Sequence, residues 1–444
     1  MLRFYIALIC SRLILLAMKL LHHKGGTSFI GMAVLKICPD FLKYCKKYLS
    51  YSTAITGTNG KTTTSGLLAQ IYKQNNSRVI HNTKGANMLT GIANMFALNI
   101  KLSSHSDVAV IESDEAYLTK LYDYLKPNFL VVTNLFRDQL DRYGELSTTA
   151  SFIQNAIDKS DDTQLILNAD DPLVANFGRG KNAVYYGIEE VEYHSNKHNH
   201  SSCAPTEIFN CICNHPLEYD KQFFAQEGHY HCSSCGYKRP DPNFKAYVKI
   251  YDKYSDIRVA WKENSYDFRL NLVGLYNVYN AIGAISAAFT SGVGYEPIKQ
   301  AVEEYKSIFG RAEKRIINGH KTLIQLIKNP TGASEVLKTV DLNSNIIVAI
   351  NDNYADGRDI SWLWDSDFEQ LKDAQKLVIT SGIRAKDMAV RLKYAGIPQE
   401  KIQVVEDIKS AIEIASSSDN MEDITILPSY TALLSINKMK FKEK

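Results

Sequence analysis

The sequence predicts an α/β protein with two domains, each organised around a parallel β-sheet. Residues 51–187 and the chain from residue 314 onward alternate apolar strands with helical segments, a pattern typical of parallel sheets with crossover helices. A glycine-rich turn at residues 56–64 joins the first strand to a helix. The 444 residues are also too many for one compact core. We therefore expect two lobes whose ligands bind beyond the carboxyl ends of the strands.

The strands follow from short apolar runs between turn signals. In the first series they are residues 52–56, 78–82, 108–111, 129–133, 164–167 and 183–186, and in the second they are residues 322–327, 345–350, 376–380, 402–405 and 424–427. Residues 247–261 also read as strands, and a helix is expected at residues 385–394.

Composition favours a globular protein and gives no support for a nucleic-acid binder. The chain is 45% hydrophobic and 22% charged, which is typical of globular proteins. Its 51 basic and 48 acidic residues leave a formal charge of +3. A balance so close to neutral gives no support for a nucleic-acid binder that relies on bulk charge.

The first 23 residues are strongly apolar but carry Arg3, Arg12 and Lys19. No uncharged run reaches the roughly 18 residues that a spanning helix needs, and no small-residue cleavage site precedes the turn at Gly25. We expect an amphipathic helix that packs on the body of the protein or rests on a membrane surface. The sequence leaves both possibilities open.

The turn at residues 56–64 reads T-G-T-N-G-K-T-T-T and predicts a nucleotide site. A glycine-rich turn between a strand and a helix points backbone N–H groups and the helix dipole at a polyphosphate. Lys61 would supply charge to the outer phosphates, and the Thr62 hydroxyl would hold magnesium. Glu112, at the end of a neighbouring strand, is suited to the same Mg²⁺. The residues expected at ATP are Gly57, Thr58, Asn59, Gly60, Lys61, Thr62 and Thr63.

The shortened glycine spacing resembles the ATP loop of the Mur ligases and folylpolyglutamate synthetases, which activate a carboxylate as an acyl phosphate for attack by an amine. The order of polar strand ends after the loop is also similar to that of the Mur ligase central domain. The resemblance implies that Asn277, with Asn280 close by, contacts adenine and that Arg311 reaches the ATP phosphates. Gln139 stands where many Mur ligases have a metal-binding histidine, and residues 147–155 contain no lysine to match their carbamylated lysine. A second magnesium site is therefore an open question.

Five of the eight cysteines are crowded into residues 203–235. The pairs C-x-C and C-x-x-C predict a structural zinc ribbon inserted at about residues 203–240, since four thiolates in tetrahedral geometry suit zinc. Cys203, His215 or His231 could replace one of the thiolates. The expected ligands are Cys211, Cys213, Cys232 and Cys235.

Residues 351–362, N-D-N-Y-A-D-G-R-D-I-S-W, follow a strand of the second series and carry three carboxylates. Together with the zinc ribbon inside a Mur-like ATPase domain, this loop resembles the MurT-type subunit of lipid II isoglutaminyl synthase. The resemblance implies a catalytic role for Asp359, completing the Cys–His pair of a partner subunit. By physical reasoning alone Asp352 and Asp356 are equal rivals.

That resemblance implies an ATP-dependent carbon–nitrogen ligase in peptidoglycan synthesis. It would amidate the α-carboxylate of D-glutamate in the lipid II stem peptide, with ATP, Mg²⁺ and a structural Zn²⁺. Ammonia would come from a GatD-type glutamine amidotransferase in a heterodimer. The location implied is cytoplasmic, peripheral at the inner face of the membrane. Two alternatives are an amino-acid-adding Mur ligase or folylpolyglutamate synthetase, and a non-catalytic nucleotide-binding scaffold.

The same resemblance suggests the domain boundaries. We expect an N-terminal amphipathic helical segment at residues 1–50, a Mur ligase-like ATP-binding domain at 51–313 and a C-terminal doubly wound Mur ligase-like domain at 314–444.

Overall fold

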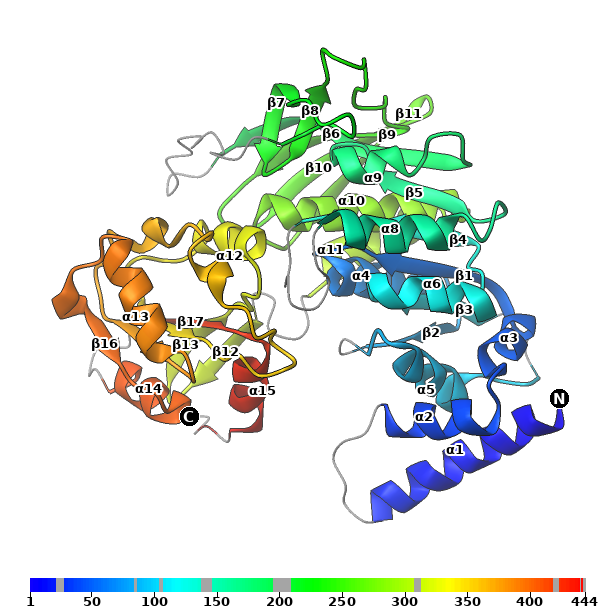
Figure 1. Ribbon diagram of the computed structural model, residues 1–444, viewed down its shortest axis with the longest axis horizontal. Coiled ribbons are helices and arrows are strands. Elements are labelled where there is room, and N and C mark those ends of the chain that lie inside the picture. Colours follow the sequence, from blue (N-terminus) through cyan, green and yellow to red (C-terminus); the bar gives the residue numbers. More distant parts are fainter. Residues whose placement is uncertain are drawn as a thin grey trace. The chain divides into compact units, whose positions relative to one another are not determined.

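The computed structural model describes residues 1–20, 28–83, 86–103, 107–136, 146–194, 209–306, 313–417, 423–439 and 441. The chain divides into two compact units (Figure 1). The first unit comprises residues 1–135 and 147–305, and the second comprises residues 136–146 and 306–444.

The first unit contains a nine-stranded sheet in the order β11-β10-β9-β6-β5-β4-β1-β3-β2. Strands β1 to β6 pair in parallel, β9 pairs in parallel with β6, and β10 and β11 continue as antiparallel neighbours. The strands are β1 (Leu49–Thr56), β2 (Val79–His81), β3 (Asp107–Glu112), β4 (Phe129–Val132), β5 (Gln164–Asn168), β6 (Ala183–Tyr193), β9 (Phe244–Ile250), β10 (Ser255–Trp261) and β11 (Asn264–Leu270).

The neighbouring strands β1 and β4 form a topological switch point, because the chain leaves them toward opposite edges of the sheet. From β1 the chain crosses to β2 on one side, whereas from β4 it crosses to β5 on the other. Because such crossovers are right-handed, α4 covers one face, where it contacts α10 and α11, and α5, α6, α8 and α9 belong to the other. The helices are α4 (Lys61–Gln74), α5 (Leu89–Asn99), α6 (Glu115–Tyr124), α8 (Leu146–Ile157), α9 (Pro172–Asn176), α10 (Leu275–Thr290) and α11 (Tyr295–Glu304).

The N-terminal helices extend this unit beyond α5 (Figure 1). They are α1 (Leu2–Leu20), α2 (Phe29–Ile37) and α3 (Phe41–Cys45), followed by the short 3₁₀ helix η1 (Lys46–Tyr48). The ring of Phe4 stacks on those of Phe41 and Tyr48, with centroids 5.1 and 6.0 Å away. In the described part of the chain, no helix is both long enough and apolar enough to cross a membrane.

The insertion after β6 contains a hairpin that the sequence pattern did not reveal. Strands β7 (Glu218–Phe224) and β8 (Glu227–His231) form a separate two-stranded sheet. Strand β6 also runs seven residues past the expected end, because its outer half pairs with β9. A small apolar cluster that includes Leu217, Tyr230 and Tyr237 packs the hairpin and its turns against α9.

The second unit has a six-stranded sheet in the order β12-β13-β17-β14-β15-β16, parallel except for the β12–β13 hairpin. The strands are β12 (Glu313–Ile317), β13 (His320–Ile324), β14 (Asn345–Ala349), β15 (Val378–Ser381), β16 (Ile402–Val404) and β17 (Ile424–Pro428). The helices are α12 (Pro330–Leu337), α13 (Ala385–Tyr394), α14 (Ile408–Ala415) and α15 (Tyr430–Lys438), with 3₁₀ turns η2 (Ser361–Leu363), η3 (Phe368–Leu371) and η4 (Gln399–Lys401). Separate apolar clusters pack the two faces of this sheet, as a doubly wound domain requires.

Candidate functional site

The loop after β1 lies at the switch point, where ligands bind in open α/β sheets. Gly57 has φ 123° and Gly60 has φ 86°, a region that residues with a Cβ rarely adopt. A Cβ on Gly60 would lie 1.9 Å from Oδ1 of Asn280, and one on Gly57 would lie 2.8 Å from the Asn134 carbonyl oxygen. The glycines therefore let the loop turn tightly between β4 and α10.

The end of β4 holds the loop by hydrogen bonds. The backbone N–H of Thr58 donates to the carbonyl of Asn134 at 2.9 Å, and that of Asn59 donates to the Asn134 side chain at 2.8 Å. The Thr133 hydroxyl donates to the Asn59 carbonyl at 2.7 Å. These contacts fix the loop before any nucleotide binds, so little ordering entropy remains to be lost.

Lys61 opens α4 and is held inside the loop. Its ammonium donates to the carbonyls of Gly57 and Thr58 and pairs with the carboxylate of Glu115 at 3.0 Å. Burial opposes the charge on Lys61, but Glu115 and Asp114 outweigh it and raise its pKa. The lysine is thus a fixed cation at the mouth of the loop. Glu115 was not assigned from the sequence, and its only signal there is a position three residues after Glu112.

Glu112 ends β3 and is 2% exposed. Its backbone N–H and carbonyl are both bonded to the side chain of Asn82, and it adds to the field that raises the pKa of Lys61. Its Oε2 atom has no hydrogen-bond partner in the described structure. A buried carboxylate oxygen left in this way is costly, and a divalent cation beside the loop would satisfy it. The residues present therefore fit Mg²⁺, with Thr62, partly exposed at the start of α4, as the second expected ligand.

The remaining expected nucleotide contacts lie on α4, on α10 or outside the described residues. Thr63, the second residue of α4 after Lys61, is buried. Asn277 donates from its side chain to the carbonyl of Val273, which precedes α10, whereas Asn280 is the asparagine that lies against Gly60. Arg311 lies outside the described residues, as does the 137–145 segment that contains Gln139.

The insertion is joined to the loop by buried polar contacts. The Asn168 side chain donates to the Thr133 carbonyl at 3.1 Å and to Glu227 of β8 at 2.9 Å. Asp170 pairs with Arg239 at 2.6 Å and accepts a hydrogen bond from Tyr279 of α10 at 2.8 Å. The insertion thus supports the end of β4, which holds the phosphate loop by hydrogen bonds.

The four expected zinc ligands come together in the insertion. The sulfur atoms of Cys211, Cys213, Cys232 and Cys235 all lie within 4.8 Å of one another, with the Cys211–Cys235 and Cys213–Cys232 pairs at 3.6 Å. Four ligands at Zn–S distances of about 2.3 Å would be about 3.8 Å apart. The four thiols therefore fit a tetrahedral zinc ion.

The surroundings of the four thiols differ in how they affect the pKa, and the histidines nearby lie at different positions. Backbone N–H groups of Cys235 and Ser234 lower the pKa of the Cys232 thiol to about 6, whereas burial raises that of Cys211 to about 12. His215 lies 3.6 Å from the Cys213 sulfur on the exposed side. His231 faces Glu218 and Asp220 instead, and Cys203 is outside the described residues.

In the second unit, the three carboxylates after β14 have different surroundings. Asp352 pairs with Arg384 at 2.7 Å, and Asp356 accepts hydrogen bonds from the backbone N–H and hydroxyl of Thr431 at the start of α15. Both are 7% exposed. Asp359 is half-buried and accepts hydrogen bonds from the backbone and hydroxyl of Ser361, two residues away.

Comparison with known proteins agrees with this architecture. The family model of the Mur ligase middle domain matches residues 55–215, and that of the MurT ligase C-terminal domain matches residues 326–433. Lipid II isoglutaminyl synthase (glutamine-hydrolyzing) subunit MurT of Streptococcus pneumoniae is 34% identical over 419 residues, 93% of this chain and 92% of the relative. The protein of the same name from Staphylococcus aureus strain COL is 34% identical over 92% of each chain.

Solved structures show the same fold. A pseudomurein peptide ligase type C from Methanothermus fervidus has a TM-score of 0.69 at 25% identity, covering 90% of this chain and 81% of that one. MurF from Acinetobacter baumannii has a TM-score of 0.63 at 15% identity, covering 92% and 80%. The Mur ligase-like fold indicated by the sequence is therefore confirmed, and the full-length similarity to the two MurT proteins shows that the chain belongs to the MurT family of Mur-ligase-type ligases.

Proposed function

We propose that this chain amidates the α-carboxylate of D-glutamate in the lipid II stem peptide. The observation that carries the proposal is 34% identity, over 93% of the chain, to a protein named as the MurT subunit of lipid II isoglutaminyl synthase. A carboxylate oxygen would attack the γ-phosphorus of ATP and release ADP. Ammonia would then attack the acyl phosphate, release phosphate and, after losing a proton, leave D-isoglutamine.

The phosphate loop would bind ATP in this reaction. Backbone N–H groups at the start of α4 would meet the phosphates, and Lys61 would exchange its contacts with the loop carbonyls for phosphate oxygens. Thr62 and Glu112 would hold Mg²⁺, which would supply charge neutralisation at the phosphates. Arg311 and Asn277 are proposed to contact the phosphates and adenine. The orphaned Oε2 of Glu112 supports the metal assignment.

The cysteine cluster would hold a structural zinc ion. Four thiolates close the coordination sphere and leave no open position for chemistry. A zinc ion there would stabilise the insertion, which in turn contacts Asn168 through β8. Metal analysis of the purified chain is expected to give one zinc per chain, reduced in the Cys213→Ser variant.

A glutaminase partner of the GatD type would supply ammonia. Asp359 is proposed to orient a histidine of that partner, and three observations support this position for the interface. Asp352 and Asp356 are buried and bonded to residues far along the chain, whereas Asp359 is half-buried and accepts its hydrogen bonds from Ser361, two residues away. Tyr354 in the same loop is 83% exposed. Ile383 is 60% exposed, and its backbone N–H donates to the side-chain oxygen of Asn351 in this loop. The lipid-linked substrate would place the complex at the inner face of the membrane.

The test is mass spectrometry of lipid II after incubation with the chain, ATP, Mg²⁺ and ammonium chloride. We expect a carboxyl-to-amide conversion that requires ATP and is lost in Lys61→Ala. Lys73→Ala is the matched control, because Lys73 is an exposed lysine near the other end of the same helix. Conversion by Lys61→Ala at the wild-type rate would contradict the proposal. Addition of an amino acid instead of ammonia would indicate an amino-acid ligase.

A further inference from the structure

The N-terminal helix α1 has an apolar face on each side. Phe4, Ala7, Leu8 and Ser11 form the buried face, at the i, i+3, i+4, i+7 spacing of one helix side. The opposite side carries a second apolar stripe, whose residues follow one another at alternating spacings of four and three. Their side chains are 42–75% exposed. Its members are Leu2, Ile6, Ile9, Leu13 and Leu16. A surface helix of a globular protein normally presents polar residues there.

This outer stripe is held facing away from the domain. The Phe4 ring is 0% exposed in an aromatic cluster with Phe41 and Tyr48. The buried Ser11 hydroxyl donates to the Leu8 carbonyl and contacts the Ala97 carbonyl of α5 at 3.4 Å. The inner face of α1 is thus already packed, and the helix cannot turn its outer stripe inward without breaking that packing.

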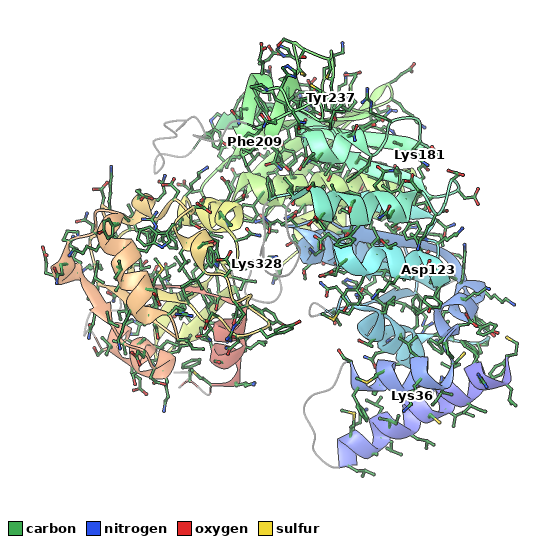
Figure 2. All side chains as sticks on the ribbon, in the orientation of Figure 1. Lys36, Asp123, Lys181, Phe209, Tyr237 and Lys328 are labelled. Atoms are coloured by element: carbon green, nitrogen blue, oxygen red, sulfur yellow. The ribbon has the colours of Figure 1, made fainter. Side chains whose placement is uncertain are left out.

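Helix α2 lies beside α1 and widens the apolar surface (Figure 1). Phe29 and Met32 are 57% and 56% exposed, and Lys36 follows one turn later on the same side. Figure 2 marks Lys36 on α2. Helix α2 packs so closely on α5 that it cannot rotate to bury these residues. A Cβ on Gly31 would lie 1.7 Å from the Thr90 carbonyl oxygen.

Charge distinguishes this end of the chain from the rest. The first 48 residues contain eight Lys or Arg and a single acidic residue, Asp40, whereas the whole chain has a formal charge of only +3. Arg3, Arg12 and Lys19 are exposed on α1. On a helical projection, Arg12 and Lys19 flank the outer stripe on one side and Arg3 on the other.

We propose that the outer surface of α1 and α2 binds the surface of a bilayer with anionic headgroups. The apolar stripe would enter the boundary between headgroups and acyl chains, with α1 parallel to the membrane plane. The flanking cations would meet lipid phosphates and add an electrostatic attraction that salt weakens. A second copy of this chain is a poorer occupant, because two surfaces of the same positive charge would repel.

This attachment would keep the catalytic unit close to a substrate that is itself anchored in the membrane. That consequence rests on the proposed function, whereas the binding surface rests on α1 and α2 alone. The two can therefore be tested separately.

The first experiment is co-sedimentation of the full chain with phosphatidylglycerol–phosphatidylcholine vesicles, without ATP or lipid II. We expect binding that weakens with salt and on pure phosphatidylcholine vesicles, and that falls at least about tenfold in Ile9→Glu/Leu13→Glu. Both residues are exposed, so the variant should fold. Val404→Glu is the control, because Val404 is 44% exposed on β16 in the second unit.

Equal sedimentation of the wild type and the double variant would overturn the proposal, as would sedimentation of neither. If the wild type dimerises without binding vesicles, and the double variant does not dimerise, the surface would instead be assigned to contact with a second copy of the chain. Amidation of lipid II in detergent micelles should be unchanged in the double variant. A chain that binds vesicles but never amidates lipid II would refute the proposed function and leave the surface intact.

Discussion

The two units each place a polar loop after a buried central strand, but they hold it by different means. The loop after β1 is held through its backbone, with glycines at the tight points and hydrogen bonds from the end of β4. The loop after β14 is held through side chains, because Asp352 and Asp356 are bonded to Arg384 and Thr431. The first arrangement leaves N–H groups and a cation for an anionic ligand, whereas the second forms a rigid support that leaves one carboxylate, Asp359, at its edge.

The largest effect that would test this comparison is expected at Asp359. Asp359→Asn should lower glutamine-dependent amidation by roughly 10³-fold in the presence of the glutaminase subunit, because an amide orients a histidine poorly. Amidation with ammonium chloride should be unchanged. Rates with the two nitrogen sources, measured on the same preparations, check this. An equal loss with ammonia would mean that Asp359 serves the synthetase reaction or the fold instead.

A smaller effect is expected at Gly60, where the first loop depends on the absence of a side chain. Gly60→Ala places a methyl group against Asn280 in a positive-φ conformation, so the loop must shift. A displacement of about 1 Å at a reactive site can cost about 10²-fold in rate. We expect the ATP affinity, measured by calorimetry, and the ammonia-dependent rate to fall together.

Gly292→Ala is the matched control for that variant. Gly292 has φ 88°, and no atom lies within 4 Å of the position that a Cβ would take, so it shares the backbone strain without the close approach. It should lose stability of about 1 kcal/mol and keep its ATP affinity. Loss of ATP binding in both variants would show that backbone strain alone, and not contact with Asn280, explains the result.

In the loop after β14, Asp356 is expected to contribute to the unfolding free energy of the protein. In Asp356→Asn, an NH₂ group replaces one of the two carboxylate oxygens. Either the backbone N–H or the hydroxyl of Thr431, at the start of α15, then loses its acceptor. Loss of such a cap costs about 1–2 kcal/mol of unfolding free energy. Urea denaturation should show this shift in Asp356→Asn and almost none in Asp359→Asn, whose bonds stay within three residues. The reverse order would exchange the roles that we assign to the two carboxylates.

Much of this architecture could be predicted because the central strands of both sheets are buried on both sides and read as continuous apolar runs. The phosphate loop and the paired cysteines were equally visible, since glycine and cysteine spacing is local. The β7–β8 hairpin was missed because its strands are polar and stabilised by contacts with distant residues. Strand β12 was missed because its first three residues are charged and only its last residue is buried.

Other features depend on tertiary packing and could not be read from the chain. The placement of Asn280 rather than Asn277 against the loop follows from how α10 packs on α4. The ion pair between Lys61 and Glu115 joins different elements of the sheet. Helix α1 is apolar on two sides, so periodicity could not show which stripe would be buried.

The effect that is smallest at neutral pH is expected at His81 in the first unit, because it develops only as the pH falls. His81 on β2 contacts the Ser65 hydroxyl of α4 at 3.2 Å, and burial, helped by Lys73, lowers its pKa to about 4. Between pH 6.5 and 4 this histidine therefore binds more protons in the unfolded chain than in the folded one, and its contribution to folding stability falls as the pH falls. The contribution of His81 is complete well above pH 6.5 and should be reduced by about 3 kcal/mol near pH 4. His81→Gln should flatten the dependence of unfolding free energy on pH in this window. His194→Gln, at an exposed histidine near the end of β6, should not; equal slopes in wild type and His81→Gln would remove His81 as the cause.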